Sequence, residues 1–79
     1  MEFEVAKNTV EKIGKQFAVV TKTDGEILTG VVDGPFAGYP NSNLESYRKN
    51  YLYVNRIDKA NNPIERVYLD EIEKIAEKN

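Results

Sequence analysis

The sequence contains no cysteine and no histidine. Without cysteine the chain can form neither a disulfide framework nor a thiolate metal site. Without histidine it lacks the commonest general base and the commonest metal ligand. Ser42 and Ser46 therefore have no identifiable partner that would activate them as nucleophiles. We expect no catalytic residue, no metal site and no cofactor site, and hence a protein that is not an enzyme.

Long apolar runs are also missing, and neither sign of charge dominates. No segment is apolar over the length needed to span a bilayer, and the first residues lack the basic and apolar regions of a signal peptide. The net charge is -2, so broad electrostatic attraction to nucleic acid or to an anionic membrane is not expected. These absences predict a cytoplasmic protein with no membrane partner.

The length of 79 residues predicts a single domain, residues 1–79, with a small core. A chain of this size buries only somewhat more than about 60% of its unfolded surface. Such domains often gain stability from partner subunits. A homo-oligomer is therefore expected.

Residues 2–12 carry the apolar spacing of a helix. Phe3, Ala6 and Val10 recur every three to four residues, and charged side chains occupy the remaining positions. Gly14 follows, and glycine readily ends a helix. A shorter helix that starts in a capping box at Asn8 and Glu11 is the alternative.

Two strands are predicted around an Asp-Gly turn. Residues 16–22 alternate between two faces, Thr23-Asp24-Gly25 supplies the turn, and residues 26–32 form the second strand. Gly30 interrupts that second strand. We expect it to permit a sharp bend or a close approach of another backbone segment.

Residues 33–50 are predicted to form an inserted loop, since this stretch is rich in Gly, Pro, Asn and Ser. Loops of this length are uncommon in small domains and are usually functional or disordered. A helical turn is expected within residues 44–49.

The C-terminal part predicts two further strands and a final short element. Residues 51–57 and 64–69 read as strands joined by a hairpin loop at 58–62. Asp70 and Glu71 form a corner, after which Ile72 and Ile75 belong to a last strand or a helical turn. Residues 77–79 are expected to be a solvated tail.

Taken together, these elements resemble the Sm-like family, whose domains combine a short N-terminal helix with five bent antiparallel strands. The residues that match its first motif are Gly14, Lys15, Phe17, Val19, Gly25, Gly30 and Val32, and those that match its second are Ile72 and Ile75. The segments Ile64-Glu65-Arg66-Val67-Tyr68 and Glu71-Ile72-Glu73-Lys74-Ile75 are similar to short bacterial and phage Sm-like proteins of unassigned function. The resemblance implies a mainly β, five-stranded, bent antiparallel small barrel of Sm-like or SH3-like type.

The loops that bind RNA in the Sm-like family differ here. The resemblance would require an Asp and an Asn after the second strand, but the Asp position falls near Phe36 inside the insert. It would also require a cation at the corner before the last strand, where this chain has Asp70 and Glu71. Carboxylates at that corner would repel phosphate. The uridine site of the family is therefore not assigned to any residue.

Aromatic and basic residues gather around the insert and form the candidate partner or RNA contacts. These are Phe36, Tyr39, Tyr47, Arg48, Lys49 and Arg56. Together with Tyr51 they are suited to stacking single-stranded bases and holding phosphates. Alternatively, Tyr51 and Tyr53 only pack on the barrel while Arg48 and Lys49 are solvated. In a third interpretation the aromatic residues anchor a protein partner.

The exposed edge of the strand at residues 64–69 contains no internal proline or glycine, so it is open to pairing with another chain. In Sm-like rings the corresponding edge meets the last strand of the neighbour. The sequence therefore favours a non-catalytic interaction or assembly module that forms homo-oligomers. A single-stranded RNA-binding protein is the alternative.

Overall fold

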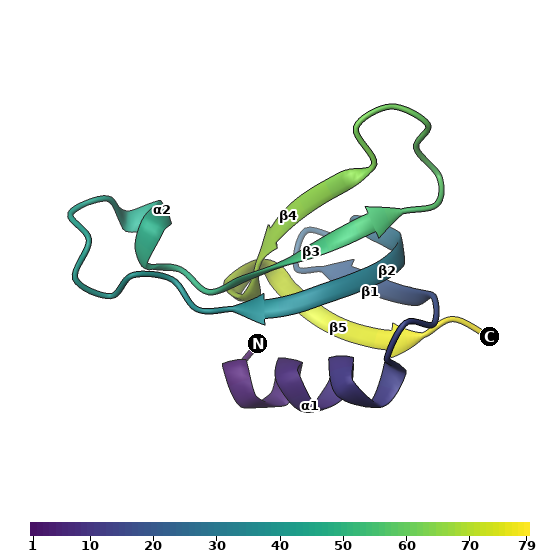
Figure 1. Cartoon of the computed structure of the whole chain (residues 1–79), viewed down its shortest axis with the longest axis horizontal. Helices are drawn as coiled ribbons and strands as arrows, with labels where there is room; N and C mark the ends of the chain where they lie inside the picture. The colour runs from purple at the N-terminus through teal and green to yellow at the C-terminus, as the bar shows by residue number, and fades with distance from the viewer.

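The computed structural model describes residues 1–79 and contains one five-stranded antiparallel sheet with a helix at the N-terminus (Figure 1). In chain order the elements are α1 (Phe3–Ile13), β1 (Ala18–Lys22), β2 (Ile27–Phe36), α2 (Glu45–Arg48), β3 (Tyr51–Arg56), β4 (Ile64–Tyr68), a 3-10 turn (Leu69–Glu71) and β5 (Ile72–Glu77). The predicted mainly β fold with a short N-terminal helix is confirmed.

Helix α1 packs its apolar stripe against β2 and β5. Ala6, Val10 and Ile13 are buried at the spacing of successive turns, as the pattern predicted. The helix ends at Gly14, which adopts φ 63° and donates its N–H to the Val10 carbonyl over 2.8 Å. Because the helix runs unbroken through Asn8, the alternative start at that residue is wrong.

The β1–β2 hairpin turns where Asp24 and Gly25 predicted it. Gly25 adopts φ 92° and donates its N–H to the Lys22 carbonyl over 2.9 Å. The Asp24 carboxylate accepts a hydrogen bond from the Glu26 N–H over 2.9 Å, and this side-chain bond stabilises the turn. The register then places Val20 opposite Leu28, and both side chains are buried.

Gly30 permits a close approach between β2 and β3. It is the register partner of Arg56, and a Cβ atom at this position would lie 2.7 Å from the Asn55 carbonyl carbon and 3.0 Å from the Arg56 Cα. No side chain fits in that space. The close backbone approach expected of Gly30 is therefore present, and it draws the central strands of the curved sheet together.

The strands are ordered β4-β3-β2-β1-β5, so β1 joins the last strand to the rest of the sheet. Ile72 and Ile75 belong to a strand and not to a helical turn, which settles the alternative left by their spacing. Ile75 pairs with Val20, and Ile72 pairs with Lys22 across a register shift. Figure 1 shows the sheet curving around its interior, with α1 along one side.

The core consists only of apolar side chains. No polar or charged side chain is buried. The core residues are Ala6, Val10, Ile13, Ala18, Val20, Leu28, Val32, Leu52, Val54, Val67, Leu69, Ile72 and Ile75. None lies between residues 33 and 51, so the insert contributes nothing to the core.

The insert is shorter than predicted, because β2 continues to Phe36. Asp33 pairs with Tyr53, and Phe36 pairs with Tyr51 across a register shift. That irregularity accommodates Gly34 and Pro35 without ending the strand, which composition alone did not indicate. The prediction of a loop over 33–50 is therefore wrong for residues 33–36.

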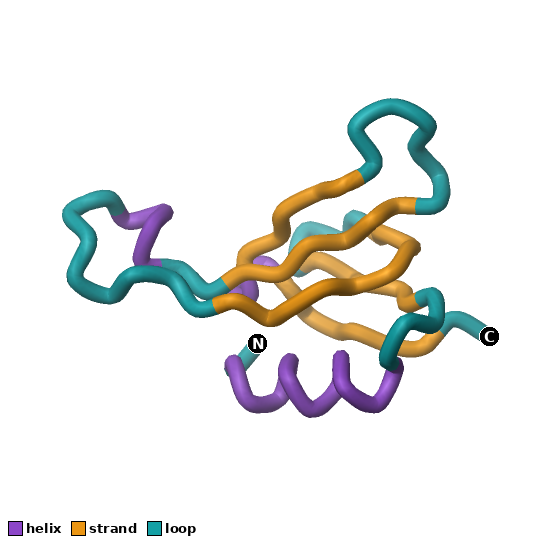
Figure 2. The backbone as a smooth tube through the Cα atoms, in the orientation of Figure 1, coloured by secondary structure: helices purple, strands orange, loops and turns teal.

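Residues 37–50, called the insert from here on, form an ordered extension that projects beyond the end of the sheet (Figure 2). The predicted helical turn is present as α2. The Tyr39 N–H donates to the Tyr47 carbonyl over 2.7 Å, and the Gly38 N–H donates to the Asn50 side chain over 3.1 Å. These two bonds close the neck of the insert.

No helix of the chain has the length and apolar character needed to cross a membrane.

Candidate interaction surface

The outer face of β2, β3 and β4 carries a cluster of aromatic side chains. Along β3, Leu52 and Val54 point into the core, so Tyr51 and Tyr53 point outward. The register places Phe36 beside Tyr51 and Arg66 beside Tyr53. We call these four residues, Phe36, Tyr51, Tyr53 and Arg66, the aromatic platform.

The three rings of the aromatic platform contact one another. Their centroids are 5.5 Å apart for Phe36 and Tyr51, 5.7 Å for Phe36 and Tyr53, and 5.6 Å for Tyr51 and Tyr53. These are tilted and edge-to-face arrangements, which aromatic quadrupoles favour. The rings therefore hold each other in place on the outer face of the sheet.

Arg66 extends from β4 across the rings. Its guanidinium carbon lies 4.9 Å from the Tyr51 centroid and 5.6 Å from that of Tyr53. Its Nη2 donates a hydrogen bond to the Tyr53 hydroxyl over 3.1 Å. This bond, with a smaller contribution from Tyr68, raises the pKa of Arg66, so the side chain stays charged.

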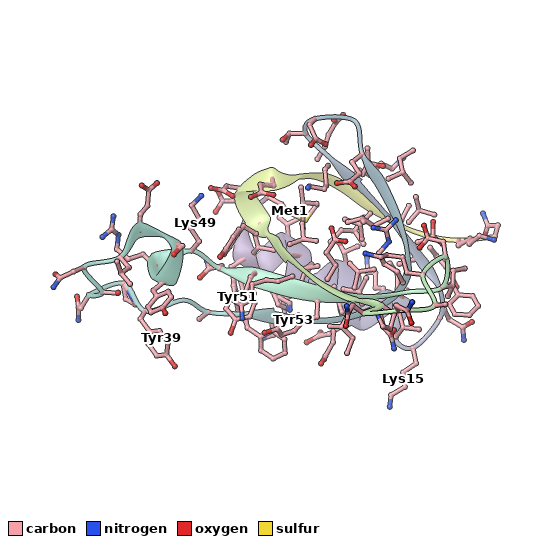
Figure 3. All side chains as sticks on the ribbon, turned by 90° about the horizontal axis from the view of Figure 1, so that it is seen from above. Met1, Lys15, Tyr39, Lys49, Tyr51 and Tyr53 are labelled. Atoms are coloured by element: carbon pink, nitrogen blue, oxygen red, sulfur yellow. The ribbon has the colours of Figure 1, made fainter.

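Two hollows flank the aromatic platform. The first, called the insert hollow, has a volume of about 250 Å³ and is lined by Gly38, Tyr39, Ser46, Tyr47, Tyr51 and Arg66. The second, called the Lys15 hollow, has a volume of about 550 Å³ and is lined by Lys15, Val31, Val32, Asp33, Tyr53, Asn55 and Ile64. Figure 3 shows Tyr39, Tyr51, Tyr53 and Lys15 on the same side of the molecule.

The structure brings three of the six predicted contact residues to this surface. Phe36 belongs to the aromatic platform, and Tyr39 and Tyr47 line the insert hollow. Tyr39 is 74% exposed and Tyr47 is 56% exposed, so both rings are open to a partner. The aromatic part of the predicted site is therefore contiguous.

The predicted basic residues of the insert lie elsewhere. The Arg48 guanidinium donates to the Ser42 carbonyl over 2.9 Å within the insert. The Lys49 ammonium is 3.2 Å from the Asp70 carboxylate and lies over the Tyr68 ring. In Figure 3, Lys49 points away from the side that carries Tyr39 and Tyr51. Neither cation joins the aromatic platform.

Arg56 is engaged at the other end of β3. Its guanidinium pairs with Asp58 over 2.8 Å and with Glu65 over 3.0 Å. These carboxylates raise the pKa of Arg56, while the bond to Arg56 lowers the pKa of Asp58. Arg56 is therefore a structural residue of the β3–β4 hairpin and is not free to bind phosphate.

The Arg56–Asp58 pair predicts a pH-dependent contribution to stability. Because the folded-state pKa of Asp58 is lowered, its stabilisation is complete above the unfolded pKa of about 4 and is lost as pH falls through the folded pKa. We expect Asp58→Asn to unfold at a lower temperature than the wild type at pH 7. This difference should shrink as the pH falls below about 4. Thermal unfolding followed by circular dichroism at several pH values measures it.

The control for this experiment is the same substitution in an Arg56→Gln background. There Asp58 has lost its main partner, so Asp58→Asn should change the unfolding temperature little at any pH. A difference between wild type and Asp58→Asn that stays constant from pH 7 to pH 2 would contradict the assignment.

Sequence reasoning missed Arg66, the cation that contacts the rings. It lies 13 residues after Tyr53, and only strand pairing brings the two together. The predicted β3–β4 hairpin would have been sufficient to identify Arg66 as a neighbour of Tyr53. A turn centred near residue 60 places residues 53 and 66 nearly opposite each other, and residues directly opposite on antiparallel strands share a face.

The surface holds no group of three or more acidic side chains close enough together to bind a metal ion, and none occurs elsewhere in the chain. Comparison of the chain with protein-family models, with curated proteins and with solved structures gave no match. The function is therefore inferred from the geometry of this fold and its surfaces.

Proposed function

We propose that the protein is a non-catalytic assembly module of Sm-like type, in which β4 of one copy pairs with β5 of the next. The observation that carries the proposal is the strand order β4-β3-β2-β1-β5, which leaves β4 and β5 as the two edges of one sheet. An edge strand presents unpaired backbone N–H and C=O groups that tend to pair with another strand. Both required surfaces are therefore present on each copy.

The edge of β4 is open along its length. Ile64–Tyr68 contains neither proline nor glycine, and Ile64 is 63% exposed. A contact between two different edges is head-to-tail, so it generates a ring if the rotation between copies closes. The N-terminal helix, the close approach at Gly30 and the terminal strand with Ile72 and Ile75 are features that the Sm-like resemblance implies, and they support this proposal.

The absence of chemistry supports the non-catalytic part of the proposal. No polar or charged side chain is buried, and the one cation on the aromatic platform is held by tyrosines. The chain also has no histidine. An interaction surface requires none of the acid–base or nucleophilic pairs that catalysis needs.

The single-stranded RNA alternative has less support. The rings that would stack bases are contiguous, but the basic residues expected to hold the phosphates point elsewhere or pair with carboxylates. Each nucleotide adds a phosphate, and affinity for a strand depends on several cations that follow it. Arg66 alone contacts the rings, so the geometry favours a protein partner.

Assembly is tested by a proline that blocks only the outer edge of β4. In the pairing of β3 with β4, the Leu69 N–H donates to the Asn50 carbonyl and the Arg56 N–H donates to the Pro63 carbonyl. Successive residues of a strand direct their N–H groups to opposite sides of it. The Tyr68 N–H, next to that of Leu69, therefore points away from β3. Tyr68 has φ -76°, which proline tolerates. We expect the wild type to sediment as an oligomer at tens of micromolar and Tyr68→Pro to sediment as a folded monomer.

Tyr68→Ala is the matched control, since it loses the same ring but keeps the N–H. We expect Tyr68→Ala to remain oligomeric, because strand pairing is carried by the backbone. A wild type that is strictly monomeric at about 50 µM would have an association free energy weaker than about 6 kcal/mol. That result would refute the assembly proposal.

A further inference from the structure

We infer that the outer face of β2, β3 and β4 binds an extended segment of a partner protein through a single acidic side chain, whose carboxylate binds Arg66. This inference goes beyond assembly through strand edges, because the outer face remains free when an edge is paired. It therefore stands or falls independently of the oligomeric state. The argument rests on Arg66, on the two hollows beside it and on the charges around them.

Arg66 carries a positive charge that no carboxylate of the chain neutralises. Three other cations form ion pairs with carboxylates: Lys22 with Glu26 at 3.0 Å, Lys49 with Asp70 at 3.2 Å, and Arg56 with Asp58 at 2.8 Å. Arg48 forms no ion pair, but its guanidinium bonds the Ser42 carbonyl within the insert. Arg66 instead lies on two rings and donates to one hydroxyl. None of its N–H groups bonds a carboxylate of the chain, and the side chain is exposed.

The rings orient this guanidinium before any partner arrives. A planar guanidinium matches a carboxylate through two parallel hydrogen bonds, and such bonds are among the stronger ones in proteins. Holding the side chain over Tyr51 and Tyr53 reduces the rotamer entropy lost on binding. Arginine and tyrosine are also enriched among the residues that dominate protein interfaces. The ligand group expected at Arg66 is therefore a single carboxylate.

The two hollows indicate what flanks that carboxylate. The insert hollow adjoins Tyr51, the Lys15 hollow adjoins Asn55, and Arg66 lies opposite Tyr53 between them. At about 3.4 Å per residue, Tyr51 and Asn55 are separated by about 14 Å along β3. An extended peptide has the same rise, and every second side chain lies on one face. It can therefore place an acidic side chain on Arg66 and an apolar or aromatic one in each hollow.

The resulting pattern is apolar, any residue, acidic, any residue, aromatic. The insert hollow suits an aromatic end because Tyr39, Tyr47 and Tyr51 line it. The Lys15 hollow suits an aliphatic end, since Val31 and Ile64 form part of its wall. Each end buries apolar surface, while the central carboxylate fixes the register.

The charges around the aromatic platform favour a peptide over a nucleic acid. Asp33 pairs with Tyr53 on the strand opposite Arg66, so a carboxylate lies in the same row of the sheet. A strand of phosphates would meet this negative charge and would find only two cations, Arg66 and Lys15, for several phosphates. A peptide with a single acidic residue between uncharged ones meets one complementary charge.

The test uses fluorescence anisotropy with labelled peptides of sequence GSLTETYSG and GSLTQTYSG, which differ only in the central acid. We expect the glutamate peptide to bind at least about tenfold more tightly than the glutamine peptide. Arg66→Gln should abolish this preference. Arg66→Lys should retain part of it, because lysine keeps the charge but not the paired hydrogen bonds.

Two further variants distinguish the site from a general charge effect. Lys59→Gln removes a positive charge from the loop between β3 and β4, outside both hollows, and should leave the preference unchanged. Tyr47→Ala should weaken the glutamate peptide severalfold, because the insert hollow loses part of its lining. Circular dichroism shows whether each variant is folded. If Arg66→Gln does not fold, the Tyr47→Ala and Arg66→Lys results test the inference instead.

Several results would overturn the inference. The inference that Arg66 binds a carboxylate would be refuted if the two peptides bound equally tightly. It would also be refuted if neither peptide bound at up to about 1 mM. Binding of a labelled ten-nucleotide oligouridine or oligoadenine that Arg66→Gln abolishes would refute it too, since it would assign the face to nucleic acid. Because sedimentation is measured separately, failure here leaves the assembly proposal intact.

Discussion

Gly30→Ala is expected to destabilise the protein by about 3 kcal/mol or more, a large share of the stability of a domain of this size. The added Cβ atom would lie 2.7 Å from the Asn55 carbonyl carbon and 3.0 Å from the Arg56 Cα. Both are backbone atoms of β3, so no side chain can rotate away. Either β3 must move from β2, which would break the pairing of Gly30 with Arg56, or the strain remains.

Chemical denaturation with urea, followed by circular dichroism, measures this effect. A domain of 79 residues has a total stability of roughly 4 to 12 kcal/mol, so the expected loss is a large share. An unfolding midpoint for Gly30→Ala within experimental error of the wild type would show that the two strands do not approach as closely as described.

Gly38→Ala is the matched control, because it blocks a glycine of similar crowding outside the core. A Cβ atom there would lie 2.6 Å from the Arg48 carbonyl carbon. The clash is confined to the neck of the insert, and residues 37–50 contribute no core side chain. We expect Gly38→Ala to lose clearly less stability than Gly30→Ala, because the neck of the insert can rearrange without separating two strands of the core. The hydrogen bond from Tyr39 to Tyr47 should weaken, and binding of the glutamate peptide with it.

Leu52→Ala is the second substitution with a large expected effect. Leu52 is fully buried on β3 and pairs with Val67, another core residue. Truncation leaves a cavity in a core of 13 residues, and the curved sheet can close it only partly. The expected loss of unfolding free energy is about 2 to 5 kcal/mol, again measured by urea denaturation.

Leu44→Ala makes the same chemical change at an exposed position. Leu44 lies in the insert and is 56% exposed, so its removal creates no cavity. Its expected effect is within about 0.5 kcal/mol. Equal losses for the two variants would contradict the division between a packed sheet and an insert that lies outside the core.

Local patterns predicted the parts of the fold that local forces determine. The spacing of Ala6 and Val10 predicted the helix, and Asp24-Gly25 predicted the first turn, because each depends on neighbours within a few residues. Gly30 was also interpretable from sequence, since a glycine inside an apolar strand usually marks a close backbone contact.

The end of β2 was not predictable in the same way. Gly34 and Pro35 are typical of loops, yet the pairing of Asp33 with Tyr53 and of Phe36 with Tyr51 carries the strand past them. Pairing between strands overrides local preference, because its hydrogen bonds and side-chain contacts form with residues 15 to 20 positions away. The insert was therefore predicted to begin four residues too early.

The candidate surface shows the same limit. Tyr39, Tyr47 and Phe36 were identified because they are clustered in the sequence, and they are close in space. The cations were chosen by the same criterion, but Lys49 and Arg56 are drawn to carboxylates on other elements. Arg66 is distant in sequence and became visible only through the β3–β4 register.

The closed neck of the insert makes this protein a convenient frame for grafting. The bonds from Tyr39 to Tyr47 and from Gly38 to Asn50 fix both ends of the segment, and no side chain within it belongs to the core. The residues between these anchors are therefore open to exchange for other sequences without a change in the scaffold. Variation confined to the tip would change the side chains presented beside the aromatic platform while the sheet kept its shape.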